Sequence, residues 1–363
     1  MKQQRQVVVI TGASAGIGRA VARAFGAQGA RVALLARGQE RLLAAAREIR
    51  ALGGDALAIP TDVADWQQVE AAAQQVEREW GAIDVWINNA MVTVFSPFTE
   101  IAPEDYRRVT EVTYQGYVWG TLAALKRMKA RNRGVIIQVG SALAYRSIPL
   151  QSAYCGAKAA IRGFTDSLRS ELIHEGSRVR LTMVQLSAFN TPQFDWSRSN
   201  MQQQAQPLPP IFQPELAASA IVEASRHPRR ELWVGLPAVK AIVGNRLLAP
   251  WLDRLMARQA YEGQQTDQPR DKGRSDNLYQ PAADNVGAHG RFDQKASTFS
   301  LQLWLNLNRR WLVPSAAVIG GMAYAWYRHR QVGASPSNVP LEQQVVDLRP
   351  FIAPSSVHES HQG

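Results

Sequence analysis

The chain has 363 residues, of which 46% are hydrophobic and 20% charged, and this composition is typical of a packed globular protein rather than a disordered one. Its one cysteine, Cys155, excludes an intrachain disulfide framework and fits a reducing compartment. The net charge of +11 is spread along the chain without a long basic tract, so we expect no nucleic-acid partner.

Strand-like and helix-like patterns alternate from Val7 onward. Each apolar, β-branched run is followed by a stretch with helical spacing, and glycines or prolines separate the two. This alternation predicts βαβ units and therefore an α/β fold, a doubly wound parallel sheet with helices on both faces. The expected strands are residues 7–10, 31–36, 55–63, 83–90, 134–141 and 178–186.

The first strand leads into the glycine-rich turn "TGASAGIG", residues 11–18. Glycines in such a turn let the backbone approach a pyrophosphate, and the following helix supplies N–H donors and a partial positive charge. Glycines also occur in ordinary turns, but the order strand, turn, helix favours a dinucleotide site. The candidate residues are Gly12, Ser14, Gly16, Ile17 and Gly18.

The end of the second predicted strand indicates the type of dinucleotide. Sites for NAD usually carry an acidic residue there, which binds the free ribose hydroxyls. This chain has Ala36 followed by Arg37. An arginine binds a 2′-phosphate with charge assistance, so we expect a preference for NADP(H). The alternative is that Arg37 is a solvated loop charge.

The pattern "YCGAK" places Tyr154 and Lys158 four residues apart, on one face of a predicted helix. A neighbouring ammonium stabilises a phenolate, so we expect Lys158 to lower the pKa of Tyr154 from its usual value of about 10. Tyr154 can then exchange a proton with a substrate oxygen. Ser141, at the end of an earlier predicted strand, is expected to supply a second hydrogen bond.

Residues 6–225 resemble the short-chain dehydrogenase/reductase family, whose members transfer a hydride between a nicotinamide and a carbonyl or alcohol. The motifs that carry the resemblance are "TGASAGIG", "TDV" (61–63), "NNA" (88–90), "VGS" (139–141) and "YCGAK". The resemblance implies a Rossmann fold. It also implies that Tyr154 and Lys158 contact the cofactor, and that Lys158 holds the nicotinamide ribose. The further cofactor residues that it implies are Asp62, Val63, Asn89, Ala90 and Thr191.

Three positions depart from the family pattern. Thr113 stands where the family usually has an asparagine that completes the catalytic set. In the family, the main-chain carbonyl of that asparagine holds a water that links the lysine to solvent, so a threonine can preserve the relay. Met91 replaces a usual glycine and is expected to crowd the cofactor or the pocket, and 187–189 replaces a usual Pro-Gly. A catalytically silent cofactor-binding protein therefore stays as an alternative.

The loop 192–214 is rich in aromatic and aliphatic residues. If it covers the active site as a lid, it favours an apolar substrate such as a lipid, sterol, terpenoid or aldehyde. Alternatively, these residues pack against the body of the protein or an oligomer interface. No cluster of histidine, cysteine or carboxylate residues has metal-ligand spacing, so we predict no metal.

We divide the chain into a Rossmann catalytic domain, 1–258, a polar linker or surface wrap, 259–298, an apolar and aromatic segment, 299–330, and a disordered tail, 331–363. Within the third part, the 17 residues Trp311–Tyr327 carry no charge. That length lies at the lower limit for spanning a bilayer. The alternatives are a membrane-spanning helix, an interfacial attachment and a helix packed on the body.

No apolar leader precedes the first predicted strand, so we expect the protein to be cytoplasmic, with possible attachment to the cytoplasmic face of a membrane through 299–330. The family resemblance also implies a homo-oligomer, a dimer or tetramer.

Overall fold

The computed structural model describes residues 5–271, 273–282 and 287–332. The chain divides into two compact units, and the first extends to Arg309. This unit contains the predicted catalytic domain together with the described part of the predicted linker, 259–298. Most of the predicted tail lies outside the described residues.

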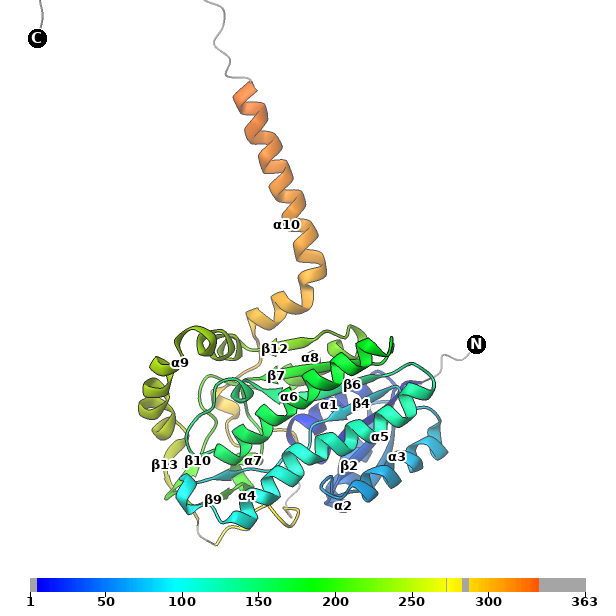
Figure 1. Ribbon diagram of the computed structural model, residues 1–363, viewed down its shortest axis with the longest axis vertical. Coiled ribbons are helices and arrows are strands. Elements are labelled where there is room, and N and C mark those ends of the chain that lie inside the picture. The colour runs from blue at the N-terminus through cyan, green and yellow to red at the C-terminus, as the bar shows by residue number, and fades with distance from the viewer. Residues whose placement is uncertain (1–4, 272, 283–286, 333–363) are drawn as a thin grey trace, which may run out of the picture. The chain divides into compact units, whose positions relative to one another are not determined.

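A seven-stranded parallel sheet forms the centre of the first unit (Figure 1). Its spatial order is β12-β7-β6-β4-β1-β2-β3, so the chain changes direction across the sheet between β1 and β4. The doubly wound fold predicted from the sequence is therefore confirmed. The strands are β1 (Val7–Thr11), β2 (Arg31–Ala36), β3 (Asp55–Pro60), β4 (Val85–Asn88), β6 (Val135–Ser141), β7 (Arg180–Leu186) and β12 (Glu231–Val234).

Helices cover both faces of this sheet because its strands are apolar on both sides. In β1, Val8 and Ile10 belong to one buried cluster, whereas Val7 and Val9 belong to another, as the two-residue period of a strand requires. One face packs against α1 (Gly16–Gly26), α2 (Gln39–Ala51) and α8 (Pro214–Arg226). The other packs against α3 (Trp66–Trp80), α5 (Gly116–Ala130) and α6 (Ser152–His174).

The segment 103–130 does not form one continuous α-helix. It consists of α4 (Pro103–Thr110), one π-helical turn (Glu111–Gln115) and α5. Turns of this kind interrupt the regular backbone hydrogen bonding of a helix and frequently occur at functional sites. Thr113 lies in this turn.

The region 187–214 contains more regular structure than the long loop expected for 197–214. Short strands hold it against other parts of the chain: β8 pairs with β11, β5 pairs with β9, and β10 pairs with β13. The elements are β5 (Val94–Phe95), β8 (Ala188–Phe189), α7 (Gln193–Trp196), β9 (Arg198–Ser199), β10 (Gln203–Ala205), β11 (Ile211–Phe212), β13 (Gln265–Pro269) and β14 (Ala296–Ser297). The polar sequence concealed these pairings because each strand is only two to five residues long.

Two further helices complete the described chain. The long helix α9 (Leu236–Gly263) bends at Leu248, two residues before Pro250, and it crosses the domain boundary that we placed after residue 258. Helix α10 (Leu301–Val332) begins in the first unit and ends in the second. Among the described residues, no helix combines the length and the apolar character needed to cross a bilayer. The membrane-spanning alternative for 311–327 is therefore not supported.

The described part of 259–298, which we call the wrap, packs against the rest of the first unit. Leu278 is completely buried within the cluster that joins the sheet to α3 and α5. Its carbonyl oxygen accepts hydrogen bonds from Arg37 and Arg108 at 3.2 Å each. Leu278 thus anchors a mostly polar segment, together with Ala288 and Phe292, which are buried in two other clusters.

We predict that Leu278→Ala lowers the free energy of unfolding by about 2–4 kcal/mol, because it leaves a cavity at a fully buried site. Leu247→Ala is the matched control, since that side chain is 75% exposed and its truncation should change stability by less than about 0.5 kcal/mol. Urea unfolding followed by circular dichroism measures both. Equal effects of the two variants would show that 276–282 is not held by Leu278.

Candidate active site

The glycine turn between β1 and α1 leaves no room for a side chain at Gly12 or Gly18. Gly12 has a φ of 66°, and a Cβ there would lie 2.7 Å from the Cα of Ala90. A Cβ on Gly18 would lie 2.2 Å from the carbonyl oxygen of Gly12. The Asn89 amide donates to the carbonyl oxygens of Thr11, at 3.0 Å, and Gly12, at 3.3 Å, and so fixes the turn.

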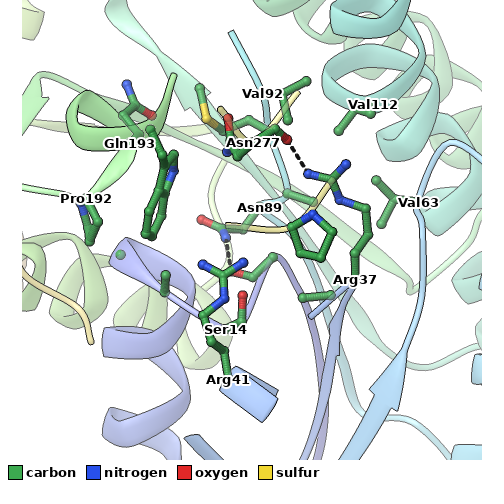
Figure 2. Close-up of a pocket in the computed structure, with 18 of the residues that line it drawn as sticks. Ser14, Arg37, Arg41, Val63, Asn89, Val92, Val112, Pro192, Gln193 and Asn277 are labelled. Atoms are coloured by element: carbon green, nitrogen blue, oxygen red, sulfur yellow. Dashed lines mark hydrogen bonds between the residues drawn. The ribbon is translucent and has the colours of Figure 1, made fainter. Parts of the chain in front are cut away.

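A cleft lies at the carboxyl ends of β1, β2, β3 and β4, beside this turn (Figure 2). Gly18 lies directly beneath the turn, and Tyr154 and Lys158 lie on a neighbouring cavity. The other residues predicted to bind the cofactor all line the cleft: Gly12, Ser14, Gly16, Ile17, Arg37, Asp62, Val63, Asn89, Ala90 and Thr191. Glycine is therefore required at 12 and 18 by close packing within the turn itself, which lets the turn fold tightly beside the cleft.

Arg37 points into this cleft, and its guanidinium is already hydrogen-bonded. It donates to the carbonyl oxygens of Leu278, at 3.2 Å, and Tyr279, at 2.8 Å, and also to that of Asn277 (Figure 2). Burial lowers the pKa of Arg37, the neighbouring Asp62 carboxylate opposes this shift, and the positive charges of Arg108 and Arg41 add to it. The alternative of a solvated loop charge is therefore wrong.

A second arginine, Arg41, was not foreseen from the sequence. It lies four residues after Arg37 near the start of α2, is almost fully buried and lines the same cleft. Its guanidinium lies 5.1 Å from the centre of the Trp196 ring, which also lines the cleft. Two guanidinium groups thus give the end of the cleft beside β2 and α2 a positive character.

The wrap reaches across the cleft at two places. Asn277 and Pro281 line the cleft, and the backbone N–H of Asn277 donates to the carbonyl oxygen of Trp196 at 2.9 Å. Further along, the backbone N–H of Gly16 donates to the carbonyl oxygen of Gly287 at 3.2 Å. No local pattern in the sequence could reveal these contacts, because the partners lie far apart along the chain.

A second cavity, of about 390 Å³, adjoins the cleft. The residues that line both are Ile17, Asn89, Met91, Thr191 and Gln193. Met91 therefore lies at the border, where the sequence placed it. The walls of the cavity are mainly apolar and come from the ends of β6 and β7, the region 187–209 and α9. Such walls suit an apolar ligand.

Ser141, Tyr154 and Lys158 meet at this cavity. Ser141 is the last residue of β6, and Tyr154 and Lys158 lie one turn apart on α6, so the sheet edge and one helix face bring them together. The side chains of Ser141 and Tyr154 are hydrogen-bonded to each other. The Lys158 side chain is 2% exposed, and its Nζ atom lies 5.5 Å from the centre of the Tyr154 ring.

The ionisation of these groups differs from the prediction. Burial raises the pKa of Tyr154, and the hydrogen bond with Ser141 opposes this only in part. The lowering of this pKa that we expected from Lys158 is therefore wrong for the protein alone. Burial also lowers the pKa of Lys158 to about 7, so the ammonium that was to stabilise the phenolate is itself destabilised.

Thr113 does not join this group through its side chain. It is completely buried, and its hydroxyl donates to the carbonyl oxygen of Val92 at 2.8 Å and accepts from the N–H of Val92 at 3.1 Å. Because its side chain is bound to Val92, Thr113 can replace the family's asparagine only through its main-chain carbonyl, the group that holds the relay water in the family.

Tyr117 was also missed from the sequence. Its hydroxyl accepts a hydrogen bond from the Nζ atom of Lys158 at 2.9 Å and donates to the carbonyl oxygen of Val139 at 2.9 Å. The available signal was its spacing from Thr113, four residues and hence one helical turn.

The departure at 187–189 has a structural explanation. The Ser187 hydroxyl donates to the carbonyl oxygen of Val234 at 2.6 Å and accepts from the N–H of Ala238 at 3.2 Å. It therefore binds the end of β12 to the first turn of α9, while Phe189 packs against Phe212. This region is built to hold α9 over the cavity.

The residues of the loop 192–214 divide between the cavity and the body of the protein. Phe194, Leu208 and Pro209 line the cavity. Ile211 and Phe212 are buried in the body instead. Among the residues that the structure describes, no group of three or more histidine, cysteine or carboxylate side chains is arranged to hold a metal ion.

Comparisons with known proteins agree with this geometry. The family model described as short chain dehydrogenase matches residues 6–202. The uncharacterized oxidoreductase YxnA of Bacillus subtilis (strain 168) is 35% identical over 327 residues, which cover 89% of this chain and 91% of that protein. The galactitol 2-dehydrogenase of Agrobacterium fabrum (strain C58 / ATCC 33970) is 36% identical over 180 residues, which cover 49% of this chain and 69% of that protein.

Two solved structures share the fold, and the matches cover 63% of this chain and 96% of each of theirs. One is a metagenomic short-chain oxidoreductase in complex with NADP, with a TM-score of 0.54 and 29% identity. The other is an alcohol dehydrogenase from the archaeon Thermococcus sibiricus complexed with 5-hydroxy-NADP, with a TM-score of 0.55 and 27% identity. This chain therefore belongs to the short-chain dehydrogenase family and is an NAD(P)-dependent oxidoreductase of alcohol or carbonyl groups.

Proposed function

We propose that this protein uses NADP(H) to reduce a carbonyl group, or to oxidise the corresponding alcohol, on an apolar small molecule. The observation that supports this proposal is the meeting of Ser141, Tyr154 and Lys158 at an apolar cavity that shares lining residues with the dinucleotide cleft. The cavity volume of about 390 Å³ falls in the range of small-molecule sites.

Residues that line both cavities, among them Asn89 and Thr191, would hold a nicotinamide, and that group would supply or accept the hydride. Tyr154 gives the substrate oxygen its proton during reduction and takes it back during oxidation, and the Ser141 hydroxyl binds the same oxygen. Because burial raises the pKa of Tyr154, its phenol is protonated at neutral pH, which is the form that a general acid needs. Lys158 holds the ribose side of the cofactor.

The preference for NADP(H) rests on Arg37 and Arg41. Both guanidinium groups line the adenosine end of the cleft, where a 2′-phosphate lies in the family. A guanidinium binds phosphate through charge-assisted, bidentate hydrogen bonds. The two solved structures that share the fold hold NADP and 5-hydroxy-NADP, respectively, which agrees with this proposal.

An interfacial membrane attachment is the second part of the proposal. Phe299, Leu301, Trp304 and Leu305 are between 45% and 59% exposed, and Arg309 and Arg310 follow them. Exposed aromatic and aliphatic residues beside basic ones suit the interface of an anionic membrane. We place the protein in the cytoplasm, where NADPH is found and where its one cysteine stays reduced, and we expect a dimer or tetramer.

We predict that Tyr154→Phe lowers turnover by about 10²–10⁴-fold, because the proton donor is lost while the ring remains. Tyr145→Phe is the control, since the Tyr145 hydroxyl is bound to Glu231 outside the cavity. NADPH absorbance is followed with a panel of apolar ketones and aldehydes, and NADPH binding is measured by fluorescence. Binding without turnover by the wild type on every compound would favour the silent alternative.

We predict that Arg37→Ala and Arg41→Ala each weaken NADPH binding by about 10–100-fold and leave NADH binding unchanged, because each removes a charge-assisted bond to the 2′-phosphate. Arg23→Ala, on a half-exposed arginine of α1, is the control. Fluorescence titration gives the dissociation constants. If Arg37→Ala weakens both cofactors equally, Arg37 acts as an anchor for residues 277–279 rather than as a phosphate ligand.

We predict that a chain ending at Arg309, with Trp304 and Leu305 both changed to serine, no longer sediments with vesicles that contain phosphatidylserine. The cut follows Arg309 because Leu303 is buried and the Gln302 side chain accepts a hydrogen bond from the N–H of Gly235 at 2.9 Å. The full-length wild type and vesicles of phosphatidylcholine alone are the controls. Equal sedimentation of both proteins would contradict the attachment.

A further inference from the structure

A second tyrosine, Tyr117, is hydrogen-bonded to the amine of Lys158. Its Nζ atom donates to the Tyr117 hydroxyl at 2.9 Å and to the carbonyl oxygen of Val139 at 2.8 Å. The Tyr117 hydroxyl donates its own hydrogen to the carbonyl oxygen of Val139, at 2.9 Å, so it can only act as an acceptor toward the amine of Lys158. Both side chains are at most 2% exposed.

The amine therefore lies between two phenol rings. Its Nζ atom is 4.7 Å from the centre of the Tyr117 ring and 5.5 Å from that of Tyr154. Two of the three N–H donors of an ammonium have partners in this arrangement, and they fix the third donor's direction. Tyr117, on α5, thus sets where an amine on α6 points.

We propose that Tyr117 is a positioning residue that keeps Lys158 oriented and charged beside Tyr154, a part that rests on the function proposed above. The main-chain relay expected at Thr113 lies one helical turn earlier on the same stretch of chain. From the family pattern we expected Lys158 to contact this stretch of chain through a water. In this protein the side-chain hydroxyl of Tyr117 contacts Lys158 directly.

The physical effect of this hydrogen bond is on the ionisation of Lys158. A buried ammonium without acceptors is strongly disfavoured relative to the neutral amine, and burial lowers the pKa of Lys158 to about 7. An acceptor that binds the charged form opposes that shift. Removing the Tyr117 hydroxyl therefore lowers the pKa of Lys158 further, and the ammonium is lost at a lower pH.

Few other groups near the amine can titrate. Tyr117 comes from α5 and Tyr154 from α6, while β6 contributes the backbone carbonyl of Val139. The adjacent cluster contains Ile161 and Met183, both apolar, and Tyr114 packs against it. Cys155, next to Tyr154 on α6, has its thiol pKa raised by burial. Burial raises the pKa of the phenols of Tyr117 and Tyr154, so neither ionises near neutral pH. A pH effect in this range is therefore assignable to Lys158.

The test is Tyr117→Phe, which keeps the ring and removes only the hydroxyl. Tyr114→Phe is the matched control, because Tyr114 packs against the same cluster and its hydroxyl makes no hydrogen bond with the described residues. With NADPH and the best carbonyl substrate, the alkaline limb of kcat/KM should move to lower pH by about one unit in Tyr117→Phe. It should stay in place in Tyr114→Phe. One unit is a tenfold change in proton affinity, about 1.4 kcal/mol.

A merely structural role gives a different result. If Tyr117→Phe lowers the melting temperature but leaves the alkaline limb where it is in the wild type, the hydroxyl serves the core alone and the proposal is overturned. Circular dichroism establishes that both variants are folded.

A second measurement decides the matter without turnover. The folded pKa of Lys158 lies below its unfolded value of about 10.4, so the unfolded chain binds more protons between the two values and stability rises with pH in that window. Tyr117→Phe should extend the window to lower pH, and it should have no such effect in a Lys158→Met background. Urea unfolding of the wild type, both single variants and the double variant, measured across pH, gives this coupling.

These readouts separate the two proposals. A wild type that reduces no compound defeats the proposed function, yet a pH-dependent coupling between Tyr117 and Lys158 still supports the positioning role. Absence of coupling overturns that role even when the wild type is active.

Discussion

The carboxyl ends of parallel strands must lie at one edge of their sheet, and every part of the site depends on that constraint. Gly12 follows β1, Arg37 follows β2, Asn89 follows β4, and Ser141 ends β6. Residues separated by more than a hundred positions therefore meet without any long-range signal in the sequence. The change of direction between β1 and β4 opens the crevice that the cleft occupies.

Burial, rather than proximity of charge, decides the ionisation of the catalytic group. A phenol and an amine one turn apart were expected to help each other, with the ammonium favouring the phenolate. In the folded protein Lys158 is buried and Tyr154 is partly buried, and desolvation favours the neutral form of each. The hydroxyls of Ser141 and Tyr117 oppose this from either side, so the polar neighbours of the pair determine its chemistry as much as the pair does.

The sequence was sufficient for the sheet, its flanking helices and most cofactor-lining positions, because apolar periodicity and glycine spacing are local properties. The sequence could not reveal that Leu278 anchors the wrap, because an isolated leucine in a polar stretch forms no apolar periodicity that would predict its burial. Nor could it show that Thr113 turns toward Val92, because a π-helical turn rotates side chains away from the positions that regular spacing predicts. Arg41 and Tyr117 were missed because the residues that they contact lie far from them along the chain.

Backbone carbonyl oxygens of the wrap occupy hydrogen-bond donors that line the cleft, so the protein itself competes with a bound dinucleotide for these donors. Carbonyl oxygens of residues 277–279 accept the hydrogen bonds of Arg37, and that of Gly287 accepts the N–H of Gly16. A dinucleotide that reaches these donors exchanges hydrogen bonds instead of adding them. Its measured affinity is therefore a difference between phosphate and carbonyl as acceptors. Since only phosphate carries a charge, raising the salt concentration tilts that exchange toward the protein's own backbone.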